Sequence, residues 1–247
     1  MHNCITRVAL VSILSALIVS CAVQEGGVQQ AAAASSPQGD TWDSIKQLPD
    51  WSGVWVKVRD SLADTMELTP EYAEIRSTAL SGHFMTNQAT CLPSGATGAL
   101  QHGVLFEFLY TPGRVTMIFE DGEVRRIYTD GREHQPLDYL TESYMGNSIG
   151  HWEGDTLVVD TIGFPYGEIW TLGGVRATID THLVERIYLN DEGNIQIDNV
   201  MTDPAIFVGP YLYSREYKPS ILTIGEAACA SGNRDTGEEI DLTPPPL

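Results

Sequence analysis

The feature that most constrains the fold is a series of short apolar runs joined by tight-turn dipeptides, from Val104 to Glu226. Dipeptides such as Pro112-Gly113 and Asp121-Gly122 separate runs in which bulky and polar residues alternate. This pattern predicts antiparallel hairpins. The expected strands are Trp51–Val58, Val104–Tyr110, Arg114–Glu120, Glu123–Thr129, Ser148–Trp152, Asp155–Thr161, Thr181–Leu189, Asn194–Thr202, Tyr211–Lys218 and Ile221–Glu226.

One helix is expected ahead of most of these runs. Thr69 suits the N-cap position, Pro70 suits the first helical position, and Gly82 is a plausible stop. Residues 83–103 are expected to form a loop. Because the strands do not alternate with helices and no repeat of fixed period is present, we expect a mainly β fold. A single antiparallel β-barrel or a strongly curved sandwich with one short N-terminal helix follows.

The first 21 residues indicate export. Val8–Val19 is an apolar run too short to span a bilayer comfortably, and it is typical of a secretory signal peptide. The sequence Val19-Ser20-Cys21 resembles a bacterial lipobox, so we expect Cys21 to be lipidated; the alternative is an ordinary cleaved signal. Ala22 after the cysteine favours anchoring at the outer membrane. The expected location is therefore periplasmic, at the outer membrane.

The expected domain organisation follows from these ends. Residues 1–20 are assigned to the signal peptide and residues 21–45, rich in Ala, Gln, Ser and Gly, to a lipidated flexible tether. Residues 46–230 are assigned to the barrel domain, and residues 231–247 to an acidic, Pro-rich tail.

Charge excludes some partners. The chain has 33 acidic and 14 basic residues, for a formal net charge of −19. Such a charge argues against nucleic acid and against anionic lipid surfaces. Contact with a membrane is therefore expected only through the lipid anchor, and the expected partner is a small organic ligand or substrate.

The cysteines suggest one disulfide. Cys4 leaves with the signal peptide and Cys21 is the lipidation candidate, so Cys91 and Cys229 remain. Two remaining cysteines in an oxidising compartment most often pair. Closing a loop of about 140 residues contributes on the order of 4–5 kcal/mol in the chain-entropy model. The alternative, a catalytic thiol, needs a cationic neighbour, and neither cysteine has one nearby in the sequence.

Alternation along the strands defines faces of mixed character. One face of Thr181–Leu189 carries His182, Val184, Arg186 and Tyr188, and one face of Glu123–Tyr128 carries Val124, Arg126 and Tyr128. A third such face carries Tyr211, Tyr213, Arg215 and Tyr217. These faces suit a lumen that holds a ligand. The alternative is that they form the solvent-exposed outside of the barrel.

The stretch from Val124 to Thr161 is the expected wall of a site. His134 and His151 fall at or beside strand ends, as His182 does further on, and an aspartate such as Asp130 or Asp160 can orient an imidazole for general acid/base work. The alternatives are structural histidines or a metal site. No H-x-H, H-E-x-x-H or C-x-x-C spacing is present, so no metal is expected.

Residues that could contact a substrate accompany these histidines. A guanidinium can bind a carboxylate or enolate through two hydrogen bonds, although each arginine could instead form a salt bridge. Ser148 does not fit the G-x-S-x-G pattern of serine hydrolases. No phosphate-binding motif follows a strand, so no nucleotide cofactor is expected. The candidate substrate contacts are Arg126, Tyr128, Arg132, Ser148, Trp152 and Arg186.

Two segments resemble a double signature of bacterial secreted proteins and lipoproteins. The segments are RRIYTDGREH (residues 125–134) and SIGHWEGDTLVVDTIGF (residues 148–164), and PDWSGVW, CLPSG and HLVERI accompany them. The resemblance covers most of the expected mature chain. It implies an architecture similar to lipocalin-like barrels, which bind apolar small molecules and sometimes isomerise, hydrate or cyclise them. This chain departs from the pattern at Gly173-Gly174-Val175 and in its long acidic tail.

Three hypotheses follow. The first is a cofactor-independent enzyme of lyase, isomerase or hydratase type, which acts on a small, partly apolar molecule in a barrel cavity. His134, His151 or His182 would transfer the proton, and Asp130 or Asp160 would orient it. The second is a non-catalytic periplasmic lipoprotein that binds a small molecule. The third is a structural envelope lipoprotein, which needs no cavity.

The disulfide can be tested directly. Mass spectrometry of peptides from the non-reduced protein is expected to find the peptides of Cys91 and Cys229 linked. Two thiols that an alkylating reagent modifies without prior reduction would contradict the pairing.

Overall fold

The computed structural model describes residues 38–62, 66–81, 92–100, 103–165, 170–171 and 175–225. They lie in one compact unit, Ser36–Leu247. The expected signal peptide and tail, Cys21, and the pair Cys91 and Cys229 lie outside the described residues. Among the helices of the described part, none is long and apolar enough to cross a membrane.

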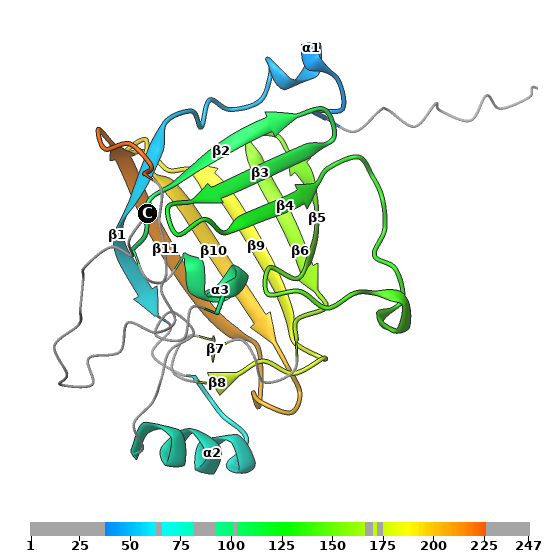
Figure 1. Cartoon of the computed structure of the whole chain (residues 1–247), viewed down its shortest axis with the longest axis vertical. Coiled ribbons are helices and arrows are strands. Elements are labelled where there is room, and N and C mark those ends of the chain that lie inside the picture. The colour runs from blue at the N-terminus through cyan, green and yellow to red at the C-terminus, as the bar shows by residue number, and fades with distance from the viewer. Residues whose placement is uncertain are drawn as a thin grey trace, which may run out of the picture. The chain divides into compact units, whose positions relative to one another are not determined.

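Nine strands close into a barrel in the order β1-β11-β10-β9-β6-β5-β4-β3-β2 (Figure 1), which confirms the prediction of a mainly β barrel. A separate two-stranded sheet pairs β7 (Trp170–Thr171) with β8 (Val175–Arg176). The barrel strands are β1 (Val54–Leu62), β2 (Phe106–Thr111), β3 (Arg114–Phe119), β4 (Val124–Tyr128), β5 (Asn147–Glu153), β6 (Thr156–Ile162), β9 (His182–Leu189), β10 (Ile195–Thr202) and β11 (Tyr211–Ser220).

The helices are short. The predicted helix is present as α2 (Pro70–Ser81), whereas α1 (Trp42–Ile45) begins at a capping box of Thr41 and Ser44, inside the range assigned to the tether. Helix α3 (Gly95–Ala99) falls where a loop was expected. A helix built of Gly, Ala and Thr has no apolar periodicity to reveal it. Burial explains why it forms, because all five of its residues are buried.

Strand β11 corrects a second expectation. Ile221–Glu226 was predicted as a strand, but β11 continues to Ser220, which pairs with Val54, and residues 221–225 are not in a strand. Pro219 is tolerated within this strand because β10 begins opposite Tyr217, so that residues 218–220 pair with β1 alone.

One strand pair departs from the expected antiparallel pattern. Strands β4 and β5 are parallel and pair over two positions, Ile127 with Ser148 and Tyr128 with Ile149. Parallel neighbours need a crossover, which here spans residues 129–146 and contains a 3-10 turn, Leu137–Tyr139. The crossover approaches β6 closely before β5 begins. A Cβ on Gly146 would lie 2.6 Å from Thr161 Cγ2, and the φ of Gly146 is +65°, so this position favours glycine.

The inside of the barrel is filled by two apolar clusters with a polar layer between them. Strand β9 crosses all three, because Leu183 belongs to one cluster, Ile187 to the other, and buried Glu185 lies between them. Strand β11 does the same with Tyr213, Arg215 and Tyr217. The lumen is therefore a core packed with side chains.

Arg125 and Glu185 form the centre of this polar layer. Both side chains are almost completely buried, and the guanidinium binds the carboxylate through two nitrogens, one of them Nη1 at 3.0 Å from Oε1. Arg125 Nε also donates to Ser148 Oγ at 3.2 Å, and Nη2 donates to Thr161 Oγ1 at 2.9 Å. A buried ion pair is tolerated when such bonds satisfy its remaining donors.

The interior also holds α3 in place. Arg215 Nη2 donates to the carbonyl oxygen of Thr97 at 3.0 Å, and the hydroxyl of Tyr217 donates to that of Leu100 at 2.7 Å. These two bonds join β11 to the helix from inside the barrel. They fix the position of Ser94 and Gly95 at the start of α3.

The structure decides which strand faces point inward. The face with Tyr211, Tyr213, Arg215 and Tyr217 points inward, as the lumen interpretation expected. The face of β9 with His182 and Arg186 points outward, and so does the face of β4 with Arg126 and Tyr128. The expectation that these two faces line the lumen is wrong, because each strand buries its other face around the Arg125–Glu185 pair.

Glu185→Ala is expected to destabilise the fold by about 3–5 kcal/mol, because it leaves the Arg125 guanidinium buried without a counter-charge. Urea unfolding measures the loss. The double variant Arg125→Met/Glu185→Leu should recover most of that loss. Glu153→Ala, which removes an exposed carboxylate from its arginine partner, should cost less than about 1 kcal/mol. Equal effects of the two single variants would contradict this account of the interior.

Candidate functional site

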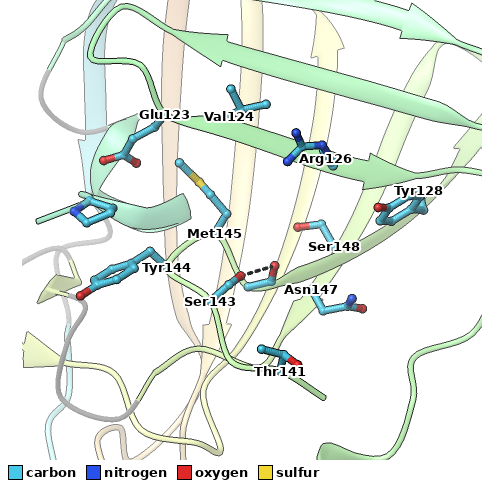
Figure 2. A pocket seen from close by; sticks show the side chains of 12 residues that line it. Glu123, Val124, Arg126, Tyr128, Thr141, Ser143, Tyr144, Met145, Asn147 and Ser148 are labelled. Atoms are coloured by element: carbon cyan, nitrogen blue, oxygen red, sulfur yellow. Dashed lines mark hydrogen bonds between the residues drawn. The ribbon is translucent and has the colours of Figure 1, made fainter. Parts of the chain in front are cut away.

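A pocket of about 420 Å³ opens where β4 and β5 diverge (Figure 2). Because the two strands pair only at their Ile127–Ser148 and Tyr128–Ile149 positions, the end of the crossover lies opposite the first residues of β4. The volume is within the range of small-molecule sites. The lining residues are Pro93, Glu123, Val124, Arg126, Tyr128, Thr141, Ser143, Tyr144, Met145, Gly146, Asn147 and Ser148.

The crossover side of the pocket is held by several contacts. Ser143 N donates to the carbonyl oxygen of Gly163 at 3.1 Å, and Ser143 Oγ donates to that of Gly146 at 3.0 Å, the bond drawn in Figure 2. The carbonyl oxygen of Tyr144 accepts from Ala96 N at 3.1 Å, which joins the crossover to α3. Met145 packs against both apolar clusters. The pocket therefore has one wall anchored to the core.

Glu123 is the acidic group of the pocket. Its carboxylate accepts hydrogen bonds from the backbone N–H groups of Ser94 and, at 3.1 Å, Gly95. Burial raises the pKa of Glu123 from 4.5 to about 7; the backbone bonds from Ser94 and Gly95 oppose this shift, and the charge of Asp121 adds to it. A carboxyl that titrates near neutral pH can both accept and donate a proton under working conditions.

Sequence reasoning missed Glu123. It follows the turn dipeptide Asp121-Gly122 and looks like one more acid at the start of a strand. Its environment depends on α3, which was expected to be a loop. No local signal in the sequence could have revealed its pKa.

Arg126 and Tyr128 line the opposite end of the pocket. Figure 2 shows Glu123 just before β4, Arg126 near the middle of the strand and Tyr128 at its far end, with Met145 between Glu123 and Arg126. Three residues along a strand span about 10 Å. The guanidinium of Arg132 lies 3.9 Å from the centre of the Tyr128 ring, and Arg132 also pairs with Asp130 at 2.6 Å. Arg132 and Asp130, both sequence candidates, thus support Tyr128 from outside the pocket lining.

Asp160 lies between two of the candidate histidines, on the outside of the barrel. His134 Nε2 is 3.0 Å from Asp160 Oδ1, and His182 Nε2 is 2.9 Å from Oδ2. His134 Nδ1 is also 2.8 Å from Oδ1 of Asn147, which lines the pocket. The structure therefore brings His134, Asp160 and His182 together and connects them to the pocket through Asn147.

The charges of this cluster are mutually supportive. Burial alone raises the pKa of Asp160, but hydrogen bonds and charges from His182 and His134 outweigh it and hold that pKa below the ordinary 3.8. The hydrogen bond from Asp160 raises the pKa of His182 above 6.5, although burial opposes this shift. The cluster thus favours an ionised aspartate beside a protonated His182.

Other sequence candidates lie elsewhere. His151 and Arg186 both contact Glu153, at 3.2 Å and 2.9 Å, in an exposed cluster. Trp152 packs 5.2 Å from Trp51 between ring centres. Neither His151, Trp152 nor Arg186 is among the residues that line the pocket.

Ser148 lines the floor of the pocket, but its hydroxyl is bonded to the interior. Ser148 Oγ accepts from Arg125 Nε and lies 2.9 Å from Thr161 Oγ1. The side chain is 1% exposed. Ser148 therefore connects the pocket floor to the buried ion pair.

The described residues contain no group of three or more His, Cys, Asp and Glu side chains that could hold a metal ion. A search of protein-family models found no match to the chain. A search of curated proteins found none either. The resemblance to secreted proteins and lipoproteins therefore stays a prediction from the sequence.

Asp160→Asn is expected to lower the free energy of unfolding by about 1 kcal/mol, with the largest loss near pH 5–6. The raised pKa of His182 contributes stability that is full below pH 6.5 and disappears as pH rises through the folded value. The lowered pKa of Asp160 contributes stability above pH 3.8 that disappears as pH falls through the folded value.

Urea unfolding of wild type and Asp160→Asn from pH 4 to pH 9 measures this difference, and Asp191→Asn in an exposed turn serves as the matched control. A difference that does not change across this range would show that Asp160 acts without its histidines.

Proposed function

We propose that this protein is a cofactor-independent general acid/base enzyme of lyase, isomerase or hydratase type. Its substrate would be a small, partly apolar organic molecule bound in the pocket between β4 and the crossover. The observation that carries this proposal is the position of Glu123, a carboxyl with a pKa of about 7 in a pocket of about 420 Å³. Strongly shifted carboxyls in pockets are common at catalytic sites.

In this proposal Glu123 removes a proton from carbon or returns one to it. General acid/base catalysis is most efficient when the pKa of the group lies near the working pH. Arg126, further along β4 in the same lining, stabilises negative charge that develops on the substrate. Val124 and Met145 supply apolar surface between the two charged groups.

The histidine cluster has a positioning role in this proposal. His134 holds the side chain of Asn147, and Asp160 fixes His134 in turn. Neither His134 nor His182 is among the pocket-lining residues. Proton transfer by these histidines, expected from the sequence, is therefore replaced by proton transfer at Glu123.

A second candidate function is binding without catalysis, as in a periplasmic carrier. One observation favours it: Glu123 already has a structural role, because it accepts the backbone N–H groups of Ser94 and Gly95 at the start of α3. The two candidates differ in whether a bound molecule is changed.

The proposed setting is the periplasmic side of the outer membrane. This part of the proposal depends on the sequence of the first 21 residues and on Cys21 as lipid anchor. The formal charge of −19 argues against nucleic acid as a partner.

The enzyme proposal predicts carbon–hydrogen exchange. A panel of small ketones, 3-oxo acids and α,β-unsaturated acids is incubated with the protein in D₂O, and ¹H NMR follows the loss of carbon-bound hydrogen. We expect exchange whose rate rises with pH through about 7, as Glu123 ionises. Glu123→Gln should lower that rate by about 10²- to 10⁴-fold.

Glu107→Gln, on β2 and outside the pocket lining, is the matched control and should exchange at the wild-type rate. Compounds that bind but do not exchange would support the carrier. Exchange that persists at full rate in Glu123→Gln would assign the proton transfer to another group.

A further inference from the structure

We infer that the molecule bound in this pocket is an organic acid, whose carboxylate binds Arg126 while its apolar body extends toward Glu123. This inference rests on the proposed function, because it assigns a substrate class to the same pocket. The proton-transfer proposal does not say which group of the ligand binds Arg126, and this inference assigns a carboxylate to that position.

The first observation is that Arg126 is a cation without a counter-charge. Its side chain is exposed and lines the pocket, and within the described part of the chain it makes no salt bridge and no side-chain hydrogen bond. Acidic residues outnumber basic ones by 33 to 14, so most arginines of this chain would be expected to pair with a carboxylate. Among the described residues, the arginines that pair with a carboxylate include Arg59, Arg125, Arg132, Arg186 and Arg215.

The second observation is a neighbouring guanidinium on the same outer face. Arg114 pairs across the strands with Tyr128, and Arg126 pairs with Thr116, so the two arginines are diagonal neighbours on β3 and β4. Diagonal neighbours lie about 7–8 Å apart. Nε of Arg114 is buried and has no hydrogen-bond partner. Neither arginine has a salt bridge among the described residues, so the two side chains together add positive charge to this outer face of β3 and β4.

The third observation is a polar donor on the facing wall. Asn147 lines the pocket, its side-chain amide carries an N–H₂ donor, and its Oδ1 lies 2.8 Å from His134 Nδ1. A guanidinium and an amide N–H on two sides match the acceptor oxygens of a carboxylate. The contact with His134 therefore holds the side chain of Asn147 in place at the pocket.

The fourth observation is the rest of the lining. Pro93, Val124 and Met145 provide apolar surface between the arginine and Glu123. Glu123 accepts the N–H groups of Ser94 and Gly95, and among the described residues it forms no salt bridge with Arg126. The negative charge of the ligand would therefore be matched by Arg126, and its apolar part would contact the apolar surface between Arg126 and Glu123. A partly apolar monocarboxylate fits this arrangement.

The test compares three acid and amide pairs of equal shape: benzoate with benzamide, cinnamate with cinnamamide, and octanoate with octanamide. Dissociation constants come from NMR titration of the purified protein at pH 7. At least one acid is expected to bind about 10- to 100-fold more tightly than its amide, because a charge-assisted bidentate contact is lost in the amide. Arg126→Gln should abolish that preference.

Arg186→Gln is the matched control. It removes the same charge from an exposed arginine that pairs with Glu153 and lies outside the pocket lining, and it should keep the preference for acids. Arg126→Lys should keep part of it, because lysine retains the charge but not the planar two-point contact. Acids and amides that bind equally well would overturn the inference. Loss of the preference in Arg186→Gln would also overturn it, because the effect would then come from net charge.

The outcomes separate this inference from the proposed function. Binding of acids that depends on Arg126, without hydrogen exchange in any bound compound, would keep the inference and favour the carrier over the enzyme. Exchange that depends on Glu123 in neutral ketones, with no effect of Arg126→Gln on their binding, would keep the enzyme and reject an acid as its substrate.

Discussion

The ion pair between Arg125 and Glu185 is the interaction on which the rest of the structure depends. It lies inside the barrel, between two apolar clusters, and it takes up the hydroxyls of Ser148 and Thr161. Ser148 is one of the two β5 residues that pair with β4. The pair therefore fixes the place where the parallel strands meet, and beyond that place they diverge into the pocket. Because the interior is packed and contains a buried ion pair, the lumen has no room for a ligand. The pocket between β4 and the crossover, in the wall of the barrel, is the position that can hold one.

The wall pocket combines groups with opposite requirements. Glu123 is surrounded by α3 and the crossover, where burial raises its pKa to about 7. Arg126, in the middle of β4, remains exposed and has no carboxylate partner within the described part of the chain. The chain has a net charge of −19, so Arg126 stays unpaired only if the nearby acidic side chains are bound by other residues. Outside the lining, Asp130 is occupied by Arg132, and Asp160 by His134 and His182.

The sequence was sufficient for the barrel because turns such as Asp121-Gly122 and period-two alternation are local signals. It was not sufficient for the faces. Strand β4 carries an arginine on each side, and the burial of Arg125 is decided by Glu185, 60 residues further along. Asp160 and His182 could be found as candidates on adjacent strands. Their contact with His134 depends on a crossover whose course no local pattern specifies, and the pKa of Glu123 depends on a helix made of small residues.

The titration of Glu123 tests this account most directly. Protein labelled with ¹³C at the glutamate carboxyl groups is followed by NMR between pH 3 and pH 9, and the Glu123 signal is assigned by its absence in Glu123→Gln. We expect a midpoint near pH 7, well above the ordinary value of 4.5, because burial opposes the ionised form. A midpoint near 4.5 would mean that the hydrogen bonds from Ser94 and Gly95 dominate. Glu123 would then be a helix cap, and the pocket would lack its proton-transfer group.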